Sequence, residues 1–276
     1  MIDVSPLAGA LGAEISGIDL AGPAPDEDFE SLRQAWLDYE VVFFRDQPIT
    51  PEAHAALAER FGSPQLHEAY PHVDGFPQVT ILENDEANPP TIEKWHTDMT
   101  FRKNPPLGSI LHGVIIPDRG GDTLFASMSA AYEGLSDAMQ QFLSSLTAIH
   151  DFSHGFRESL NAPGGRERLA QMVADNPPVE HSVVHVHPET GKKCIYVNSL
   201  FTVGIKDMKP RESDALLAFL FEHVTTPEYT CRFRWQPDSI AFWDNRSVQH
   251  KPVNDYWPRH RKMQRITIDD AGATPS

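Results

Sequence analysis

The stretch FWDNRSVQHKPVNDYWPRHRKMQRITI (residues 242–268) holds two strand patterns separated by a turn-rich segment. His250 follows the first strand pattern, and Arg261 and Arg265 lie on the second. Residues four apart share one face of a strand, so both guanidinium groups face the same way. Two guanidinium groups inside a barrel are unfavourable unless each meets an anion. The stretch therefore indicates an anion site or, if that face is exposed, two surface arginines.

Other short segments are rich in β-branched and aromatic residues and are bounded by Pro, Gly, Asn or Asp, which is typical of strands. These strand candidates are residues 41–47, 78–84, 107–116, 181–188, 193–199, 231–235, 239–245 and 261–270. Amphipathic patterns predict helices at residues 26–39, 50–62, 129–146 and 211–225. The mixture favours a mixed β fold, with a double-sheet jelly-roll core flanked by α-helices.

The composition is that of a folded protein with a sizeable core, since 40% of the 276 residues are hydrophobic and 22% are charged. We expect one domain over residues 1–276, with a helical insert at roughly residues 129–175. The net charge of -16 argues against nucleic acid or an anionic membrane as a partner. If the substrate is an anion, the positive charge that holds it must be local.

Neither a signal-peptide pattern nor a membrane span is evident. The first residues are acidic where a signal peptide needs a basic start, and no run approaches about 18 apolar residues. We therefore expect a cytoplasmic protein. Cys194 and Cys231 lie outside any CxxC or Cys/His array, which argues against a disulfide framework or a thiolate zinc site.

A histidine and an aspartate two positions apart occur in EKWHTDMTF (residues 93–101), a segment that alternates like a strand. On a strand, His96 and Asp98 would both point into a barrel, while Thr97 and Met99 would point away. That arrangement would present one imidazole and one carboxylate to a metal ion.

The spacing alone is weak support for a metal site. HVD (72–74) and HPE (187–189) have the same spacing, but they run into Gly and Pro and are typical of turns. Two ligands do not hold a catalytic metal, and the two-histidine, one-carboxylate triad that suits non-haem Fe(II) needs a second histidine. His250 is the best candidate.

Four motifs together resemble a known family. They are WHTDMTF (95–101), GGDTLFAS (120–127), HPETGKKCIYVN (187–198) and WDNRSVQHKPVNDY with RHRKMQRITI (243–268). In this order they resemble the taurine dioxygenase / 2,4-D dioxygenase family of Fe(II)- and 2-oxoglutarate-dependent oxygenases. The resemblance covers nearly the whole chain and implies a double-stranded β-helix. It also implies that O2 and 2-oxoglutarate are consumed, giving succinate and CO2, while a C–H bond of the substrate is hydroxylated.

The resemblance assigns roles to particular residues. It implies that His96, Asp98 and His250 bind Fe(II) and are the catalytic centre. It implies that Arg261 and Thr123 bind the far carboxylate of 2-oxoglutarate. A guanidinium group offers a planar fork for a carboxylate, and a hydroxyl can satisfy a remaining lone pair.

The resemblance also implies a substrate pocket. In taurine dioxygenases the sulfonate is held by residues that match His67 and Arg265, and the aromatic walls match Tyr70, Phe156 and Phe201. All five are present here. Aromatic residues are more often core than pocket, so the three aromatic assignments compete with an ordinary packing role.

Three positions depart from the family pattern. Ile92 replaces the asparagine that contacts the amino group of taurine, Gly155 replaces a serine, and Met99 replaces a smaller valine. Ile92 cannot accept a hydrogen bond from an ammonium group. We therefore predict a small organic substrate with an anionic head and an apolar body.

The substrate predicted first is a taurine-like sulfonate, which would release sulfite and an aldehyde after hydroxylation. An alkyl sulfate or a phenoxyalkanoate carboxylate is the alternative, and taurine itself stays open. Outside this class, the same ligands would suit a zinc hydrolase, or the chain would be a non-catalytic barrel. Because relatives often associate, the resemblance also allows a homo-oligomer. Residues 151–169 are either a lid or an ordinary surface connection.

Overall fold

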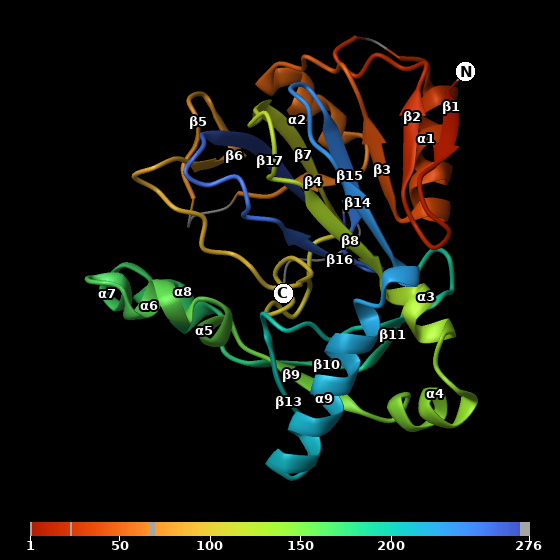
Figure 1. The fold of residues 1–276 in the computed structure, drawn as a ribbon, viewed down its shortest axis with the longest axis vertical. Coiled ribbons are helices and arrows are strands. Elements are labelled where there is room, and N and C mark those ends of the chain that lie inside the picture. The colour runs from red at the N-terminus through yellow and green to blue at the C-terminus, as the bar shows by residue number, and fades with distance from the viewer. Residues whose placement is uncertain (1, 23, 67–69, 271–276) are drawn as a thin grey trace.

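The computed structural model describes residues 2–22, 24–66 and 70–270, and its largest element is a curved, mostly antiparallel sheet (Figure 1). In spatial order its strands are β1 (Asp3–Pro6), β2 (Ala13–Ser16), β3 (Val41–Phe44), β15 (Ile240–Asp244), β7 (Gly108–Ile115), β17 (Arg261–Asp269), β6 (Phe76–Asn84) and β5 (His72–Val73), and β4 (Ser63–Pro64) also pairs with β17. Only the β2–β3 pair is parallel among the described strands.

A smaller sheet packs on the inner face of the large one. Its strands are β14 (Thr230–Phe233), β8 (Thr123–Ser127) and β16 (Val248–Pro252). Along β3, Val41 and Phe43 pack in the cluster between the sheets, while Val42 and Phe44 pack in the cluster on the outer face. This alternation follows from the two-residue period of a strand. Phe43 stacks on Phe233 of the small sheet, with ring centroids 4.2 Å apart. The predicted jelly-roll core is confirmed.

Two helices cover the outer face of the large sheet. They are α1 (Asp26–Tyr39) and α2 (Pro51–Glu59), close to the predicted ranges. Trp36 of α1 is fully buried and stacks on Phe242 of β15, with ring centroids 4.6 Å apart. The Thr50 side chain accepts a hydrogen bond from the backbone N–H of Ala53 and so caps α2.

A second group of elements lies below the two sheets in Figure 1. It contains α3 (Met128–Glu133), α4 (Asp137–Leu143), α9 (Pro210–Val224), the 3₁₀ helix Pro227–Tyr229, a sheet of β10 (Val179–Ser182), β9 (Thr147–His150) and β13 (Thr202–Ile205), and the hairpin of β11 (Val184–Val186) and β12 (Lys193–Ile195). Its apolar residues form a separate core cluster that includes Leu217 and Leu220 of α9.

Four short helices extend to the side of the molecule in Figure 1. They are α5 (Phe152–Gly155), α6 (Arg157–Asn161), α7 (Gly165–Arg168) and α8 (Ala170–Asp175). Residues 129–175, predicted as a helical insert, therefore contain α4–α8 and most of α3, together with the strand β9. No helix in the described part of the chain is long and apolar enough to cross a membrane.

Two predicted elements are each divided in two. Residues 129–146 form α3 and α4, because the chain turns after Gly134, whose position leaves room for the Tyr229 hydroxyl, and Ser136 then caps α4. Residues 181–188 are divided between β10 and β11 at Val183. This residue is fully buried, and its backbone hydrogen bonds go to Leu146 and Tyr196 of other segments. Long-range contacts therefore override the local pattern at both places.

Candidate metal centre and anion pocket

Two histidines and one aspartate meet at the edge of the small sheet. His96 pairs with His250 of β16 through two backbone hydrogen bonds, of 3.0 and 2.7 Å. The Nε2 atoms of His96 and His250 lie 3.8 and 3.9 Å from Oδ1 of Asp98. All three residues are buried, and one nitrogen or oxygen atom from each lies within 4.8 Å of the others. Their spacing and donor types are suitable for a single metal ion.

Hydrogen bonds and burial leave the two imidazoles ready to bind a metal. The Nδ1–H of His96 donates to the carbonyl oxygen of Lys94 at 2.9 Å, so the lone pair of this ring is on Nε2. Burial lowers the pKa of His250 to about 3 and also lowers the pKa of His96. Both rings are therefore neutral at pH 7, which is the form that coordinates metals.

The carboxylate of Asp98 is held ionised. Burial alone would raise its pKa, but the nearby charge of Arg265 and the hydrogen bond from Ser109 hold the pKa of Asp98 below its usual value. The hydroxyl of Ser109 donates to Oδ2 at 2.8 Å, which leaves Oδ1 facing the two imidazoles. Two neutral imidazoles and one carboxylate are the donor set of the facial triad in non-haem Fe(II) enzymes, so these residues fit Fe(II).

The strand predicted at residues 93–101 was wrong. Only the bridge at His96 pairs as a strand does, and the chain turns directly after Thr97. Thr97 and Met99, expected to point away from the barrel, are both buried, and the Thr97 hydroxyl donates to the carbonyl oxygen of Val248 at 2.9 Å. His96 and Asp98 thus come together at a turn. Met99 has φ of 50°, a left-handed conformation that is costly for a residue with a side chain.

A buried polar network holds this turn from behind. The Thr100 hydroxyl accepts from the side-chain amide of Asn198 and contacts Nδ1 of His150, each at 2.9 Å. Nε2 of His181 lies 2.9 and 3.0 Å from the carbonyl oxygens of Thr100 and Arg102. These residues were not identified from the sequence, because the contacts join distant segments. They stabilise the strained backbone that carries Asp98 and Met99.

Arg261 and Thr123 both lie close to Trp235. Arg261 is 7% exposed, its Nε atom has no hydrogen-bond partner among the described residues, and burial lowers its pKa. Its Cζ atom lies 5.6 Å from the Tyr256 ring centroid and 6.0 Å from that of Trp235. The indole N–H of Trp235 donates to the Thr123 hydroxyl at 2.9 Å, so the hydroxyl proton is available to another acceptor. This arrangement is suitable for a ligand carboxylate.

Arg265 lies between the metal cluster and an aromatic ring. Its Nη1 atom is 3.4 Å from Oδ1 of Asp98, and its Cζ atom is 5.9 Å from the Tyr70 ring centroid. Its Nε atom has no hydrogen-bond partner in the described part of the chain. The prediction that Arg261 and Arg265 share one face of a strand is confirmed, since both are buried on β17. His67, the other predicted anion contact, lies outside the described residues.

Two of the three predicted pocket aromatics, Phe156 and Phe201, belong to one apolar cluster, whereas Tyr70 lies at Arg265. Met99, Phe152 and Phe201 are buried together with Phe101, and Phe156 packs against them. The Phe101 ring centroid lies 5.0 Å from that of Phe201 and 6.1 Å from that of Phe156. Phe101 was not identified from the sequence, although it ends the same segment as His96 and Asp98. The cluster places an apolar surface directly after the metal-binding turn.

Gly155 determines how closely Phe201 approaches. A Cβ atom on Gly155 would overlap two atoms of the Phe201 ring. The backbone of Phe201 is fixed, since its N–H donates to Asn198 Oδ1 and its carbonyl accepts from the N–H of Asp151, both at 2.9 Å. The ring therefore occupies space that a serine side chain would need. The glycine that replaces the family's serine at residue 155 therefore changes the shape of the apolar cluster.

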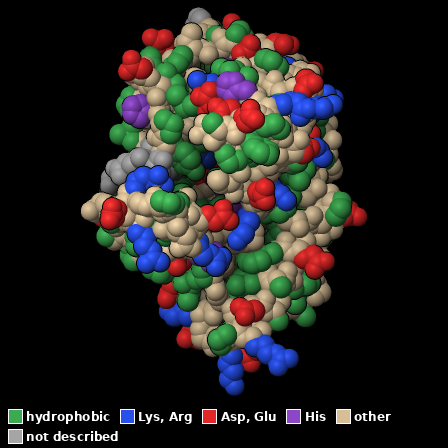
Figure 2. All heavy atoms as spheres, turned by 60° about the vertical axis from the view of Figure 1, so that its left-hand side comes forward, with side chains coloured by type: hydrophobic (Ala, Val, Ile, Leu, Met, Phe, Trp, Pro, Cys, Tyr) green, Lys and Arg blue, Asp and Glu red, His purple; other side chains and the backbone are tan. Residues whose placement is uncertain are grey.

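Ile92 lies elsewhere, on a cleft of about 310 Å³ that it lines with Tyr70 and Arg261. Its carbonyl oxygen accepts a hydrogen bond from the side chain of Asn254 at 2.9 Å. The structure thus brings Ile92 and Arg261 to one cleft, and Met99, Phe156 and Phe201 to one cluster. Figure 2 shows that this side of the molecule is hollowed near its centre, and that Lys and Arg side chains gather below the hollow.

Comparison with known proteins agrees with this arrangement. Residues 3–267 match the model of the family described as "Taurine catabolism dioxygenase TauD, TfdA family". An alkylsulfatase of Acinetobacter baylyi is 40% identical over 266 residues, which cover 95% of this chain and 83% of that protein. An alpha-ketoglutarate-dependent sulfate ester dioxygenase of Pseudomonas putida is 35% identical, and the match covers 99% of this chain and 91% of that protein.

A solved structure agrees as well. The crystal structure of a taurine dioxygenase from Burkholderia xenovorans superposes with a TM-score of 0.83 at 39% identity, covering 97% of this chain and 90% of that one. The jelly-roll core and the cluster of His96, Asp98 and His250 are those of a metal-dependent oxygenase. The chain belongs to the TauD, TfdA family of dioxygenases. It is an Fe(II)- and 2-oxoglutarate-dependent dioxygenase that consumes O2, as predicted.

Replacing Ser109 should weaken metal binding without unfolding the protein. Ser109→Ala removes the hydrogen bond that orients Asp98, and we expect the affinity for Fe(II) to fall by about 10- to 100-fold, as for other groups that orient metal ligands. Anaerobic titration with Fe(II) measures this affinity directly. Thr267→Val is the matched control, because Thr267 lies beside Ser109 and does not contact Asp98. Equal affinities of the two variants would contradict the role of Ser109.

Proposed function

We propose that this dioxygenase oxidises an organic anion that carries a sulfo group on an apolar chain without an amine. The sulfo group is joined through oxygen, as in an alkyl sulfate, or through carbon, as in an alkylsulfonate. The observation that carries the proposal is the position of Arg265, a buried cation beside Asp98, close to the apolar side chains of Met99 and Phe101 that follow Asp98 in the sequence. A buried guanidinium group of this kind favours an anionic ligand.

In this proposal His96, Asp98 and His250 hold Fe(II). Arg261 and Thr123 bind the far carboxylate of 2-oxoglutarate. The support is that Arg261 is buried and that its Nε atom has no hydrogen-bond partner among the described residues, while Thr123 keeps its hydroxyl proton for an acceptor. The rings of Trp235 and Tyr256 flank the guanidinium group and keep water away from it. A carboxylate there would satisfy the charge that the described residues leave unpaired.

Arg265, with His67 and Tyr70, binds the anionic head of the substrate. The net charge of the chain is -16, so a local cation is needed to attract an anion. Arg265 also faces Asp98, and this contact fixes the guanidinium group near the metal centre. A head group bound by Arg265 would therefore lie near the metal ligands, and the carbon next to the head group is the one brought to the metal.

The walls of the pocket exclude an amine. Met99, Phe156 and Phe201 offer no acceptor for an ammonium group, and Ile92 replaces the amide that would contact taurine. Burying an ammonium group without a partner is unfavourable by several kcal/mol. The similarity to an alkylsulfatase and to a sulfate ester dioxygenase supports a substrate that carries a sulfo group.

The products follow from the hydroxylated carbon. When bound, Fe(II) with 2-oxoglutarate and O2 supplies the oxidising power for hydroxylation of a C–H bond, and one oxygen atom leaves in succinate. If the hydroxylated carbon bears a sulfate ester, its C–O bond breaks to give an aldehyde and hydrogen sulfate. If it bears a sulfonate, the C–S bond breaks to give an aldehyde and hydrogen sulfite. The pocket residues orient this carbon and exclude water.

A substrate screen tests the proposal. Release of succinate is measured with hexyl sulfate, hexanesulfonate, taurine and phenoxyacetate, and released sulfate or sulfite identifies the bond that breaks. We expect hexyl sulfate or hexanesulfonate to drive turnover at least tenfold more efficiently than taurine, because an ammonium group has no partner in the apolar wall. Strong turnover of taurine, or of phenoxyacetate alone, would contradict the proposal.

The role of Arg261 has its own test. Arg261→Gln removes a charged hydrogen-bond donor to the carboxylate of 2-oxoglutarate. Because of this loss, we expect the KM for 2-oxoglutarate to rise by roughly 10- to 100-fold. Initial rates over a 2-oxoglutarate series measure this change. Arg259→Gln is the control, since Arg259 pairs with Asp118 on the more exposed side of the same segment. An unchanged KM in Arg261→Gln would rule out carboxylate binding by this residue.

Gly155→Ser restores the serine of the family pattern and should alter the substrate pocket. The new side chain displaces the Phe201 ring into the apolar cluster, and we expect KM for hexyl sulfate to rise roughly tenfold, as for moderate overpacking. Steady-state kinetics measure the change. The double variant Gly155→Ser, Phe201→Leu removes the overlap and should recover most of the affinity. If the single variant binds hexyl sulfate normally, Gly155 does not shape the pocket.

A further inference from the structure

Residues 197–202 form a largely buried turn that leads from β12 into β13. The turn is closed by two hydrogen bonds between its ends. The N–H of Asn198 donates to the Thr202 hydroxyl at 2.9 Å, and the N–H of Thr202 donates to the carbonyl oxygen of Asn198 at 3.1 Å. Asn198 is only 1% exposed. The segment is therefore a fixed part of the interior rather than a loose surface connection.

This turn contacts the residues that precede the two histidine ligands. The Ser199 hydroxyl donates to the carbonyl oxygen of Trp95 at 3.1 Å, and Trp95 directly precedes the first histidine ligand. The side-chain amide of Gln249, which directly precedes the second histidine ligand, donates to the carbonyl oxygen of Val197 at 2.7 Å. One short segment thus supports both histidines from behind.

Asn198 extends this support to the third ligand and uses both ends of its side-chain amide. Its Oδ1 atom accepts from the N–H groups of Leu200 and Phe201, at 3.2 and 2.9 Å. These two donors fix the oxygen on that side, so the NH₂ group faces Thr100 and donates to its hydroxyl at 2.9 Å. Thr100 lies two residues after Asp98. One buried side chain therefore joins the metal-binding turn to the backbone of Phe201.

The metal-binding turn depends on such support. Met99, between Asp98 and Thr100, has φ of 50°, a conformation that persists only where surrounding contacts impose it. Groups that orient metal ligands from outside change metal affinity by about 10- to 100-fold. A misplacement of about 1 Å between a substrate and a reacting group can lower a rate about 100-fold. The separation of Asp98 and the pocket wall is therefore a quantity on which catalysis depends.

We propose that Asn198 is a positioning residue that holds the metal-binding turn and the pocket wall at a fixed separation. The inference rests on the proposed function, because that function makes Phe201 a wall of the substrate pocket. Asn198 acts through Thr100 at one end and through the backbone of Phe201 at the other, without touching the metal or the substrate. It thereby keeps the substrate carbon in reach of the metal centre, so that substrate oxidation accompanies each consumption of 2-oxoglutarate.

Anaerobic titration with Fe(II) tests the metal end without any substrate. Asn198→Ala and Thr100→Val each remove the hydrogen bond between the two side chains, and we expect each to weaken Fe(II) binding roughly tenfold. Ser213→Ala is the matched control, because the buried Ser213 hydroxyl accepts from the N–H of Ile205 at the other end of β13, at 2.8 Å. Unchanged Fe(II) affinity in Thr100→Val, or an equal loss in Ser213→Ala, would overturn the proposal.

The pocket end is tested by the yield of product. Aldehyde and succinate are measured with the better of hexyl sulfate and hexanesulfonate, and ascorbate supplies electrons in the cycles that miss the substrate. We expect equal amounts from the wild type, and an aldehyde-to-succinate ratio at least twofold lower in Asn198→Ala and Thr100→Val. The KM for the substrate should rise several-fold in Asn198→Ala alone, since Thr100→Val leaves the contacts of Oδ1 with Phe201 intact. Loss of stability alone would not change this ratio.

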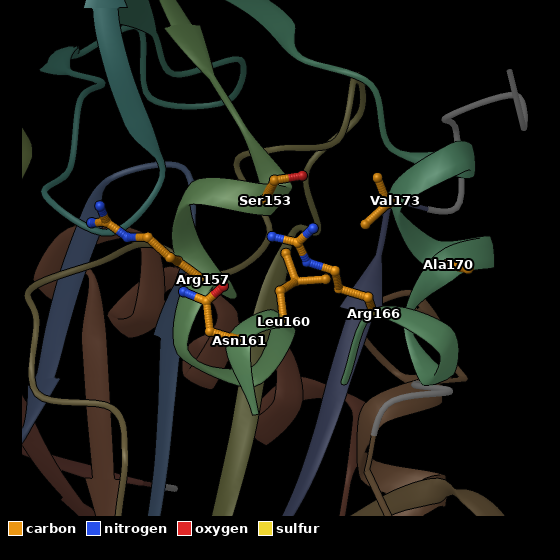
Figure 3. A pocket seen from close by; sticks show the side chains of 7 residues that line it. All are labelled: Ser153, Arg157, Leu160, Asn161, Arg166, Ala170 and Val173. Atoms are coloured by element: carbon orange, nitrogen blue, oxygen red, sulfur yellow. The ribbon is translucent and has the colours of Figure 1, made fainter. Parts of the chain in front are cut away.

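A second control lies on the other side of Phe201. The N–H of Asp151, which caps α5, donates to the carbonyl oxygen of Phe201 at 2.9 Å, so looser packing of α5–α8 would also move this wall. These helices enclose a groove of about 590 Å³, and Figure 3 shows the side chains that line it, Leu160 among them. Leu160→Ala loosens this packing and leaves Asn198 intact, so its aldehyde-to-succinate ratio should equal that of the wild type. An equal fall in Leu160→Ala would contradict the role of Asn198.

The outcomes separate this inference from the proposed function. If the wild type oxidises neither alkyl sulfates nor alkylsulfonates, the proposed function fails, and the Fe(II) titration still decides whether Asn198 and Thr100 position the metal ligands. If the wild type oxidises one of them and Asn198→Ala keeps the wild-type ratio of aldehyde to succinate, the proposed function stands and the role of Asn198 is overturned.

Discussion

Two backbone hydrogen bonds between His96 and His250 hold the active site together. They attach an irregular segment to the edge of the small sheet and place two imidazoles side by side, with ring centroids 4.2 Å apart. Asp98 then reaches the same point through the turn that follows His96. The position of the metal ligands therefore depends on strand pairing that the sheet core fixes, while the turn is held by the buried network around Thr100.

The second constraint is the burial of two arginines on one face of β17. A guanidinium group inside a protein is stable only where anions or aromatic faces surround it. Arg265 has Asp98 and the Tyr70 ring, and Arg261 has the rings of Tyr256 and Trp235. Both keep an unpaired Nε atom among the described residues. In this acidic protein the two buried arginines make the barrel interior a place of local positive charge, which favours organic anions.

Much of this could be predicted from local sequence patterns. The β-branched and aromatic composition of β3 and β17 and the amphipathic pattern of α1 are properties of single segments, so they predicted these elements. The spacing of Arg261 and Arg265 predicted that both lie on one face of β17, but not that this face is buried. The turn at Asp98 could not be predicted, because its residues alternate as a strand does and only contacts to Val248 and His181 show otherwise. The roles of Trp235 and Gly155 depend on neighbours from distant segments, which a single sequence does not reveal.

The aromatic cluster of Met99, Phe101, Phe152 and Phe201 is separate from the three larger cores. Helices as short as α5–α8 are unstable alone, so this segment depends on the few apolar contacts that join it to the cluster. Such a segment opens at a lower free energy than the whole domain unfolds. A ligand that packs against this cluster would stabilise the folded segment, so ligand affinity and local stability would be thermodynamically linked. A substitution that tightens the packing of α5–α8 would therefore strengthen ligand binding without touching the ligand.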